Sequence, residues 1–218
     1  MLSPERLDAL QRSWVHLLAP FGVEPAAAYP VFDRLVDAHA EPHRHYHTLE
    51  HVAEVLRVAG RLGGGPAVLL ATWFHDAVYD PRATDNEGRS AGLAERELTG
   101  LALPAEVVRH VADLVRSTAH FDGSTFTGPD FDILHDADLA ILAAAEPRYA
   151  RYAADVRREY DWVPDADYRA GRTKVLNSFL GRERIFRNGV MFAEGEAAAR
   201  RNLRAEVDEL ARRSHSPV

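Results

Sequence analysis

The sequence contains no cysteine, and this absence removes several classes of chemistry. Without thiols there is no disulfide bond, no thiolate nucleophile and no cysteine-ligated zinc or iron–sulfur cluster. Any metal site in this chain must therefore use histidine, carboxylate and water ligands, which suit hard or borderline divalent cations.

Long apolar runs and an excess of positive charge are also missing. No segment approaches the roughly 20 apolar residues that span a bilayer, and the first residues lack the basic and apolar regions of a signal peptide. The net charge of −7 disfavours a nucleic-acid polymer as partner, because such binding relies on a basic surface. We expect a cytoplasmic protein without a nucleic-acid or membrane partner, and this charge remains compatible with a small phosphorylated substrate. Its oligomeric state stays open, with a homodimer among the options.

Helical patterns fill the sequence, and we find no alternating pattern typical of a β-strand. Apolar residues recur at helical spacing, for example at Leu7, Leu10, Trp14 and Leu17. A chain of 218 residues with 46% hydrophobic content can bury one substantial core. The sequence predicts an all-α protein, a helical bundle in which residues 1–218 form a single domain.

Histidines and acidic residues gather between residues 44 and 80. His47 and His51 are four residues apart, so on one helix both imidazoles would project from the same face. His75 and Asp76 follow an apolar run, so a buried helix would deliver an imidazole and a carboxylate together. Burying such groups together is costly unless they are paired or bind a cation. The pattern favours a metal site over a purely structural cluster.

A further carboxylate comes from residues 134–142. Either Asp138 or Asp136 would enter a helix predicted over residues 136–145, whose next residues are strongly apolar, as an inward-facing ligand would. Asp136 equally suits the N-terminus of that helix, where the helix dipole favours a negative charge. The residues alone leave this choice open.

The order His51, then His75-Asp76, then Asp138 in a helical chain resembles the HD superfamily of metal-dependent phosphohydrolases, whose signature is H…HD…D. Residues 46–51 are similar to the Y-H-N-x-x-H pattern of cyclic-nucleotide phosphodiesterases, with threonine in place of asparagine. Further motifs are shared with a group of predicted HD phosphohydrolases of roughly this length; they are R-H-Y-H-x-x-x-H, F-H-D-x-V-Y-D, D-N-E-x-x-S-A, D-A-D-L-A-I-L and V-R-x-E-Y. This resemblance extends over most of the chain.

The resemblance implies that a divalent ion, one of Mn, Fe, Co, Mg, Ni or Zn, is held by His51, His75, Asp76 and Asp138. Two neutral imidazoles and two carboxylates balance the charge of such an ion. The ion would acidify a bound water toward neutral pH and so produce a nucleophile. His47 is expected to act as general acid for the leaving oxygen, with the orientation of His51 as its alternative role.

The remaining candidates lie around these ligands. Asp76 could also orient the attacking water, and Asp80 lies where some HD relatives carry an acid that helps to activate it, although a plain loop carboxylate is an equal interpretation. The candidate substrate contacts are Asn86, Glu87, Ser90, His120 and Arg157. For the first three the alternative is a helix N-terminus capped by Asp85. For Arg157, as for Arg172, it is a solvated side chain or a pair with glutamate.

Three functions are compatible with these residues. The leading one is a mononuclear HD phosphohydrolase that cleaves a small phosphate ester, expected to be a nucleotide, with metal-activated water. The second is a dinuclear HD enzyme, either a phosphodiesterase or a di-iron oxygenase, because His110 and His120 lie where some HD proteins hold a second metal. The third is a catalytically silent, metal-stabilised helical protein that binds a ligand or a partner.

Overall fold

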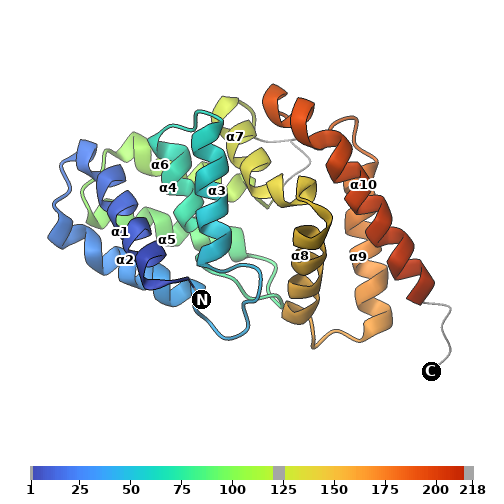
Figure 1. Cartoon of the computed structure of the whole chain (residues 1–218). Coiled ribbons are helices and arrows are strands. Elements are labelled where there is room, and N and C mark those ends of the chain that lie inside the picture. The colour runs from blue at the N-terminus through green and yellow to red at the C-terminus, as the bar shows by residue number, and fades with distance from the viewer. Residues whose placement is uncertain (1, 120–125, 214–218) are drawn as a thin grey trace. The chain divides into compact units, whose positions relative to one another are not determined.

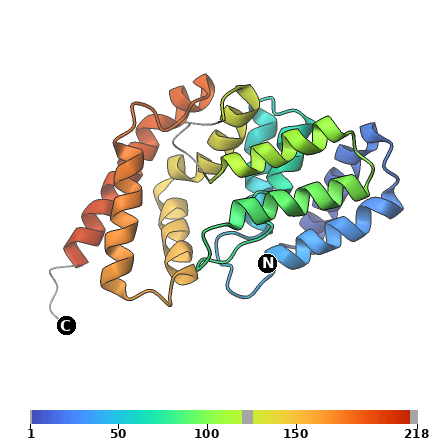
Figure 2. The same cartoon turned by 180° about the vertical axis from the view of Figure 1, so that it is seen from behind.

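The computed structural model describes residues 2–119 and 126–213, and every regular element in these ranges is helical (Figures 1 and 2). This confirms the predicted all-α class. The chain forms two compact units, Met1–Ala137 and Asp138–Val218. None of the helices in the described ranges is both long enough and apolar enough to cross a membrane.

The first unit is built from α-helices and one short 3-10 helix, with the bounds α1 Pro4–Leu18, η1 Ala19–Phe21, α2 Pro25–His39, α3 Leu49–Arg61, α4 Pro66–Phe74, α5 Asn86–Gly100, α6 Ala105–Ser117 and α7 Pro129–Asp138. The last residue of α7 is the first residue of the second unit. That unit continues with η2 Leu139–Ala143, α8 Glu146–Glu159, α9 Asp165–Leu180 and α10 Gly189–Arg213.

Helix α4 is the central helix of the first unit and contacts α1, α3, α5 and α6, of which α5 and α6 lie side by side (Figure 2). Its nine residues are apolar almost all round, and a helix without a polar face is stable only when other elements cover it on all sides. Val68, Leu70, Trp73 and Phe74 are fully buried, and each such side chain contributes about 1.5–3 kcal/mol. The end of α4 therefore lies in the interior of the unit.

An aromatic cluster behind α4 fixes the rotation of this helix about its axis. Trp73 on α4 meets Trp14 on α1 edge to face, with ring centroids 5.5 Å apart, and meets Phe32 on α2 in the same way at 5.8 Å. Trp14 Nε1 donates to Ala28 O at 3.0 Å, which joins α1 to α2. Each edge-to-face pair contributes about 0.5–1.5 kcal/mol beyond its buried area. These contacts therefore determine the direction in which the C-terminal residues of α4 point.

In the second unit, α10 packs along α9 and η2 (Figure 1). Arg172 on α9 and Glu206 on α10 form a buried ion pair at 2.8 Å, and the Tyr149 hydroxyl of α8 donates to the same carboxylate. Burial and the charge of Glu206 raise the pKa of Tyr149, so this hydroxyl keeps its proton and remains a donor. Helices α8, α9 and α10 also line a pocket of about 600 Å³, to which Arg157 contributes.

Helix α7 differs from the predicted helix over residues 136–145. It begins at Pro129, a residue favoured at the first helical position because its missing N–H would have no partner there. It ends at Asp138, and η2 follows. Asp136 therefore lies in the last turn, where the helix dipole disfavours a carboxylate, and the helix-N-terminal role considered for it is wrong.

His47 does not share a helix with His51. Helix α3 begins at Leu49, because Thr48 has an extended backbone and its Oγ1 accepts a hydrogen bond from Glu50 N at 3.3 Å. His47 precedes this N-cap, so the predicted common helical face is wrong. The two rings are nevertheless close, with centroids 5.8 Å apart.

His39, the last residue of α2, is a buried neutral imidazole. It is 2% exposed, and its Nδ1 donates to Leu35 O at 2.8 Å. Burial, and next the nearby positive charge of Arg44, lower the pKa of His39 to about 3. The unfolded chain takes up this proton near pH 6.5 and the folded chain does so only near pH 3. The folded state therefore loses stability as the pH falls through this window, by up to about 1.4 kcal/mol per pH unit.

We expect His39→Leu to remove this part of the pH dependence. Between pH 7 and pH 5.5, the free energy of unfolding of the wild type should fall by about 1.2 kcal/mol more than that of the variant. Urea unfolding at both pH values measures this difference, and any change in packing cancels because it is present at both. The same pH dependence in both proteins would contradict a buried neutral imidazole.

Candidate metal centre

Helices α3 and α4 bring the Nε2 atoms of two imidazoles together. His51 lies in the first turns of α3 and His75 directly follows α4; they are 3% and 1% exposed, with their Nε2 atoms 3.1 Å apart. His75 Nδ1 donates to Thr72 O at 2.8 Å, because a carbonyl oxygen can only accept. In the neutral ring, which is the form that binds a metal, the lone pair is therefore on Nε2, the atom that lies nearest to His51.

Asp76 adds a carboxylate to this pair of rings. Its Oδ2 lies 3.1 Å from His75 Nε2 and 3.4 Å from His51 Nε2, and its side chain is 19% exposed. Burial alone would raise the pKa of Asp76, but the charges of His75 and His47 and the hydrogen bonds from His51 and His75 outweigh it. Together they hold the pKa of this carboxyl well below its usual range, so Asp76 is negatively charged at neutral pH.

Asp138, at the end of α7, completes the group. One ligand atom each from His51, His75 and Asp138 lie within 4.8 Å of one another, an arrangement that can hold a metal ion. Asp136 is engaged differently, since it is fully buried and its Oδ1 accepts from His135 Nδ1 at 2.7 Å. Of the two carboxylates that the sequence left open, Asp138 is the one that lies with the imidazoles.

The donor atoms of His51, His75 and Asp76 satisfy a simple distance test for one ion. Ligand atoms that each lie about 2.0–2.2 Å from an ion can be at most about 4.4 Å apart. The three distances that join His51, His75 and Asp76 are all below this limit. Imidazole nitrogens and carboxylate oxygens without sulfur are the donor set of divalent Mn, Fe, Co, Ni and Zn. The residues present therefore fit a divalent metal.

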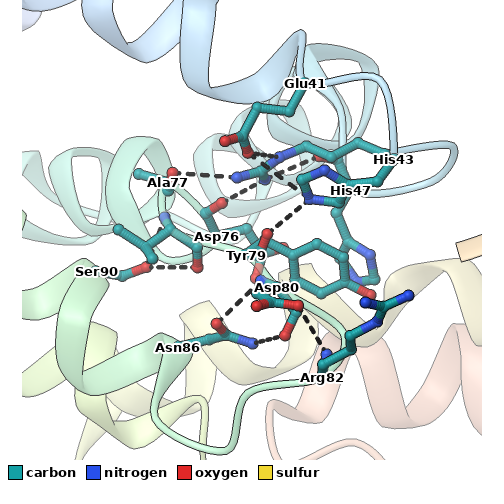
Figure 3. Close-up of polar contacts among 12 residues, drawn as sticks. Glu41, His43, His47, Asp76, Ala77, Tyr79, Asp80, Arg82, Asn86 and Ser90 are labelled. Carbon is teal, nitrogen blue, oxygen red and sulfur yellow. Dashed lines mark hydrogen bonds and ion pairs between the residues drawn. The ribbon is translucent and has the colours of Figure 1, made fainter.

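The two other predicted catalytic residues, His47 and Asp80, have different surroundings. The His47 ring packs against Tyr79, with centroids 4.2 Å apart, on the side of His51. Asp80 lies at an exposed position in the loop after α4, where its Oδ1 accepts from Arg82 N at 2.9 Å (Figure 3). His47 is thus adjacent to the metal ligands, and Asp80 stabilises a turn.

The predicted substrate contacts on α5 bind the main chain of the same loop (Figure 3). Asn86 Oδ1 accepts from Asp80 N at 3.0 Å, and its Nδ2 donates to Asp80 O at 2.8 Å. Ser90 Oγ accepts from Val78 N at 3.0 Å and donates to Val78 O at 3.2 Å. Glu87 lies half-buried in the first turn of α5.

The remaining candidates either have other hydrogen-bond partners or lie outside the described residues. Arg157 is in the second unit, where its guanidinium donates to two carbonyls in the connection between α8 and α9. His110 on α6 is hydrogen-bonded to Asp130 on α7 at 2.7 Å. His120, the other residue considered for a second metal, lies outside the described residues.

Sequence reasoning missed Arg44. Its side chain is completely buried, and its guanidinium donates to the main-chain carbonyls of His47 and Asp76. A signal was present, because a lone arginine stands within the histidine-rich stretch. Its partner 32 residues away could not be predicted from spacing, since that contact depends on how α4 packs.

No family model, no curated protein and no solved structure matches the chain. The case for a metal centre therefore rests on the distances, the burial and the ligand chemistry of these side chains.

We expect Mn²⁺ or Co²⁺ to raise the melting temperature of the metal-free protein. An ion that binds only the folded chain, at a hundred times its Kd, stabilises it by about 2.7 kcal/mol, or about 5–10 °C for a chain of this length. His51→Ala should abolish the increase, and His110→Ala should keep it. Thermal melts with and without metal measure both, and an equal response of the two variants would remove His51 from the ligand set.

Proposed function

We propose that this protein is a metal-dependent phosphohydrolase of the HD type that cleaves a small phosphate ester, with nucleotides as the expected substrates. The proposal rests on the two imidazoles of His51 and His75, which lie close to Asp76 and to Asp138, with His47 beside them. A hard or borderline divalent ion on nitrogen and oxygen ligands binds phosphate oxygens well, which supports phosphate chemistry over other reactions.

The metal ion and Asp76 have different roles in this mechanism. When bound, the ion would polarise a phosphoryl oxygen and acidify a water molecule toward neutral pH. Asp76 remains ionised because its pKa is held low, so it can orient the attacking water by accepting a hydrogen bond. The proton that the water loses passes to solvent.

His47 donates the proton that the leaving group needs. In the hydrolysis, a bond forms between the water oxygen and phosphorus, and the bond between phosphorus and the alcohol oxygen breaks. The departing oxygen would be a high-energy alkoxide unless it takes up a proton. Imidazole is suited to supply one at neutral pH. His47 is only half-buried, so its ring can contact a substrate placed on the ligand group.

We expect His47→Ala to lower turnover of a nucleoside monophosphate by about 10²–10⁴-fold with metal content unchanged, the usual contribution of a general acid. The loss should shrink for p-nitrophenyl phosphate, whose leaving group departs without a proton. His16→Ala is the control, since His16 is an exposed histidine in the last turn of α1. Phosphate release from both substrates measures the effect.

Two results would count against this mechanism, each in a different way. Equal losses on activated and unactivated esters would remove the proton-donor role and leave His47 a positioning residue. If the wild type released no phosphate from a nucleotide panel with Mn²⁺, Co²⁺, Mg²⁺ or Fe²⁺, the proposed activity itself would be wrong.

A further inference from the structure

Side chains form hydrogen bonds with the main chain of the loop after α4 throughout residues 76–80. Residues 76–80 lie outside any helix, and loop carbonyls ordinarily face water. Here every one of the five carbonyl oxygens accepts a hydrogen bond from a side chain. The pairs are Asp76 O with Arg44, Ala77 O with Arg44, Val78 O with Ser90, Tyr79 O with His43, and Asp80 O with Asn86 (Figure 3).

Arg44 binds this segment from the side of the loop before α3. Its NH1 donates to Asp76 O at 2.6 Å and to His47 O at 3.2 Å, and its NH2 donates to Ala77 O at 3.1 Å. Its Nε donates to Glu41 Oε2 at 2.9 Å, which supplies the countercharge. The guanidinium of Arg44 thus links the main chain of His47, the proposed proton donor, to the main chain of Asp76, a proposed metal ligand.

Asn86 and Ser90 bind the segment from the side of α5, and their spacing matches it. Four residues along a helix rise about 6.0 Å, and two residues of an extended chain span about 6.6 Å. Side chains four apart on α5 can therefore each bind the N–H and C=O of alternate loop residues, Val78 and Asp80. The sequence D-N-E-x-x-S places the two side chains at this spacing.

We infer that Arg44, Asn86 and Ser90 are positioning residues that hold segment 76–80 in its metal-binding conformation before the metal arrives. The inference rests on the proposed metal-dependent function, because Asp76 is the ligand that the segment carries. A carboxylate on a mobile loop must be ordered when the ion binds, and ordering it beforehand raises affinity. Groups that orient metal ligands typically change metal affinity 10–100-fold when they are removed.

The first test measures metal affinity. Arg44→Met keeps an unbranched apolar stem and removes all the donors, and Arg44→Lys keeps the charge but lacks the planar fork that bonds several carbonyls at once. Both should weaken Co²⁺ binding, measured by competition with a chelator, by about 10–100-fold and should change the Co²⁺ absorption spectrum. Arg57→Met is the matched control, because the exposed Arg57 pairs only with Glu54 on α3 among the contacts described, and it should bind Co²⁺ as the wild type does.

The second test measures the segment without metal. The Val78 and Asp80 amides should exchange slowly with solvent in the metal-free wild type. Ser90→Ala should speed exchange at Val78 by at least about tenfold, and Asn86→Ala should do so at Asp80. These milder variants also keep the inference testable if the Arg44 variants fail to fold, since each should lower Co²⁺ affinity as well.

The outcomes separate this inference from the proposed function. Variants with lower melting temperatures but wild-type Co²⁺ affinity and spectrum would show a merely structural role and overturn the inference. Rapid exchange of the Val78 and Asp80 amides in the wild type would also overturn it. A wild type that binds no metal at all would instead overturn the proposed function.

Discussion

The burial of charge at the end of an apolar helix is the constraint on which the rest of this structure depends. Helix α4 builds the core of the first unit, and the next two residues are His75 and Asp76. An isolated charge in such a place would cost several kcal/mol. Here His51 faces both groups, and the imidazoles hold the pKa of Asp76 low. The nitrogen lone pairs and carboxylates that meet there are together the ligand set of a divalent cation.

The surroundings of this cluster restrict its geometry from two sides. Before it in the chain, the edge-to-face contacts of Trp73 with Trp14 and Phe32 fix how α4 is rotated about its axis. After it, side-chain donors hold the main chain of segment 76–80. Neither group touches a substrate in the proposed reaction. Both explain why a short connection between α4 and α5 can present a carboxylate in a defined position.

Local patterns in the sequence predicted the helical class and the residues that converge. The apolar run before His75 predicted a buried helix that ends in the interior, because nothing but burial stabilises such a helix. The order of His51, His75-Asp76 and Asp138 predicted that distant segments would meet, and the structure brings these residues together. Ligand chemistry made this prediction possible, since few other arrangements tolerate these groups in a core.

Features that depend on caps and long-range contacts could not be predicted in the same way. Helical spacing placed His47 on α3, but the Thr48 cap starts that helix later. The predicted start of α7 at residue 136 was wrong, because the helix begins at Pro129. For Asn86 and Ser90 the sequence offered substrate contacts or a helix N-terminus, but it could not predict that their polar atoms bind a loop main chain whose path is set by packing. Periodicity carries no information on such contacts.

The most direct test of the metal centre is a crystal structure of the protein soaked with Mn²⁺, with an anomalous difference map at the manganese absorption edge. We expect one strong peak, about 2.0–2.3 Å from the Nε2 atoms of His51 and His75 and from carboxylate oxygens of Asp76 and Asp138. A peak coordinated by Asp136 in place of Asp138 would show that the last ligand is wrong. A saturated crystal with no peak between the two imidazoles would contradict the metal centre itself.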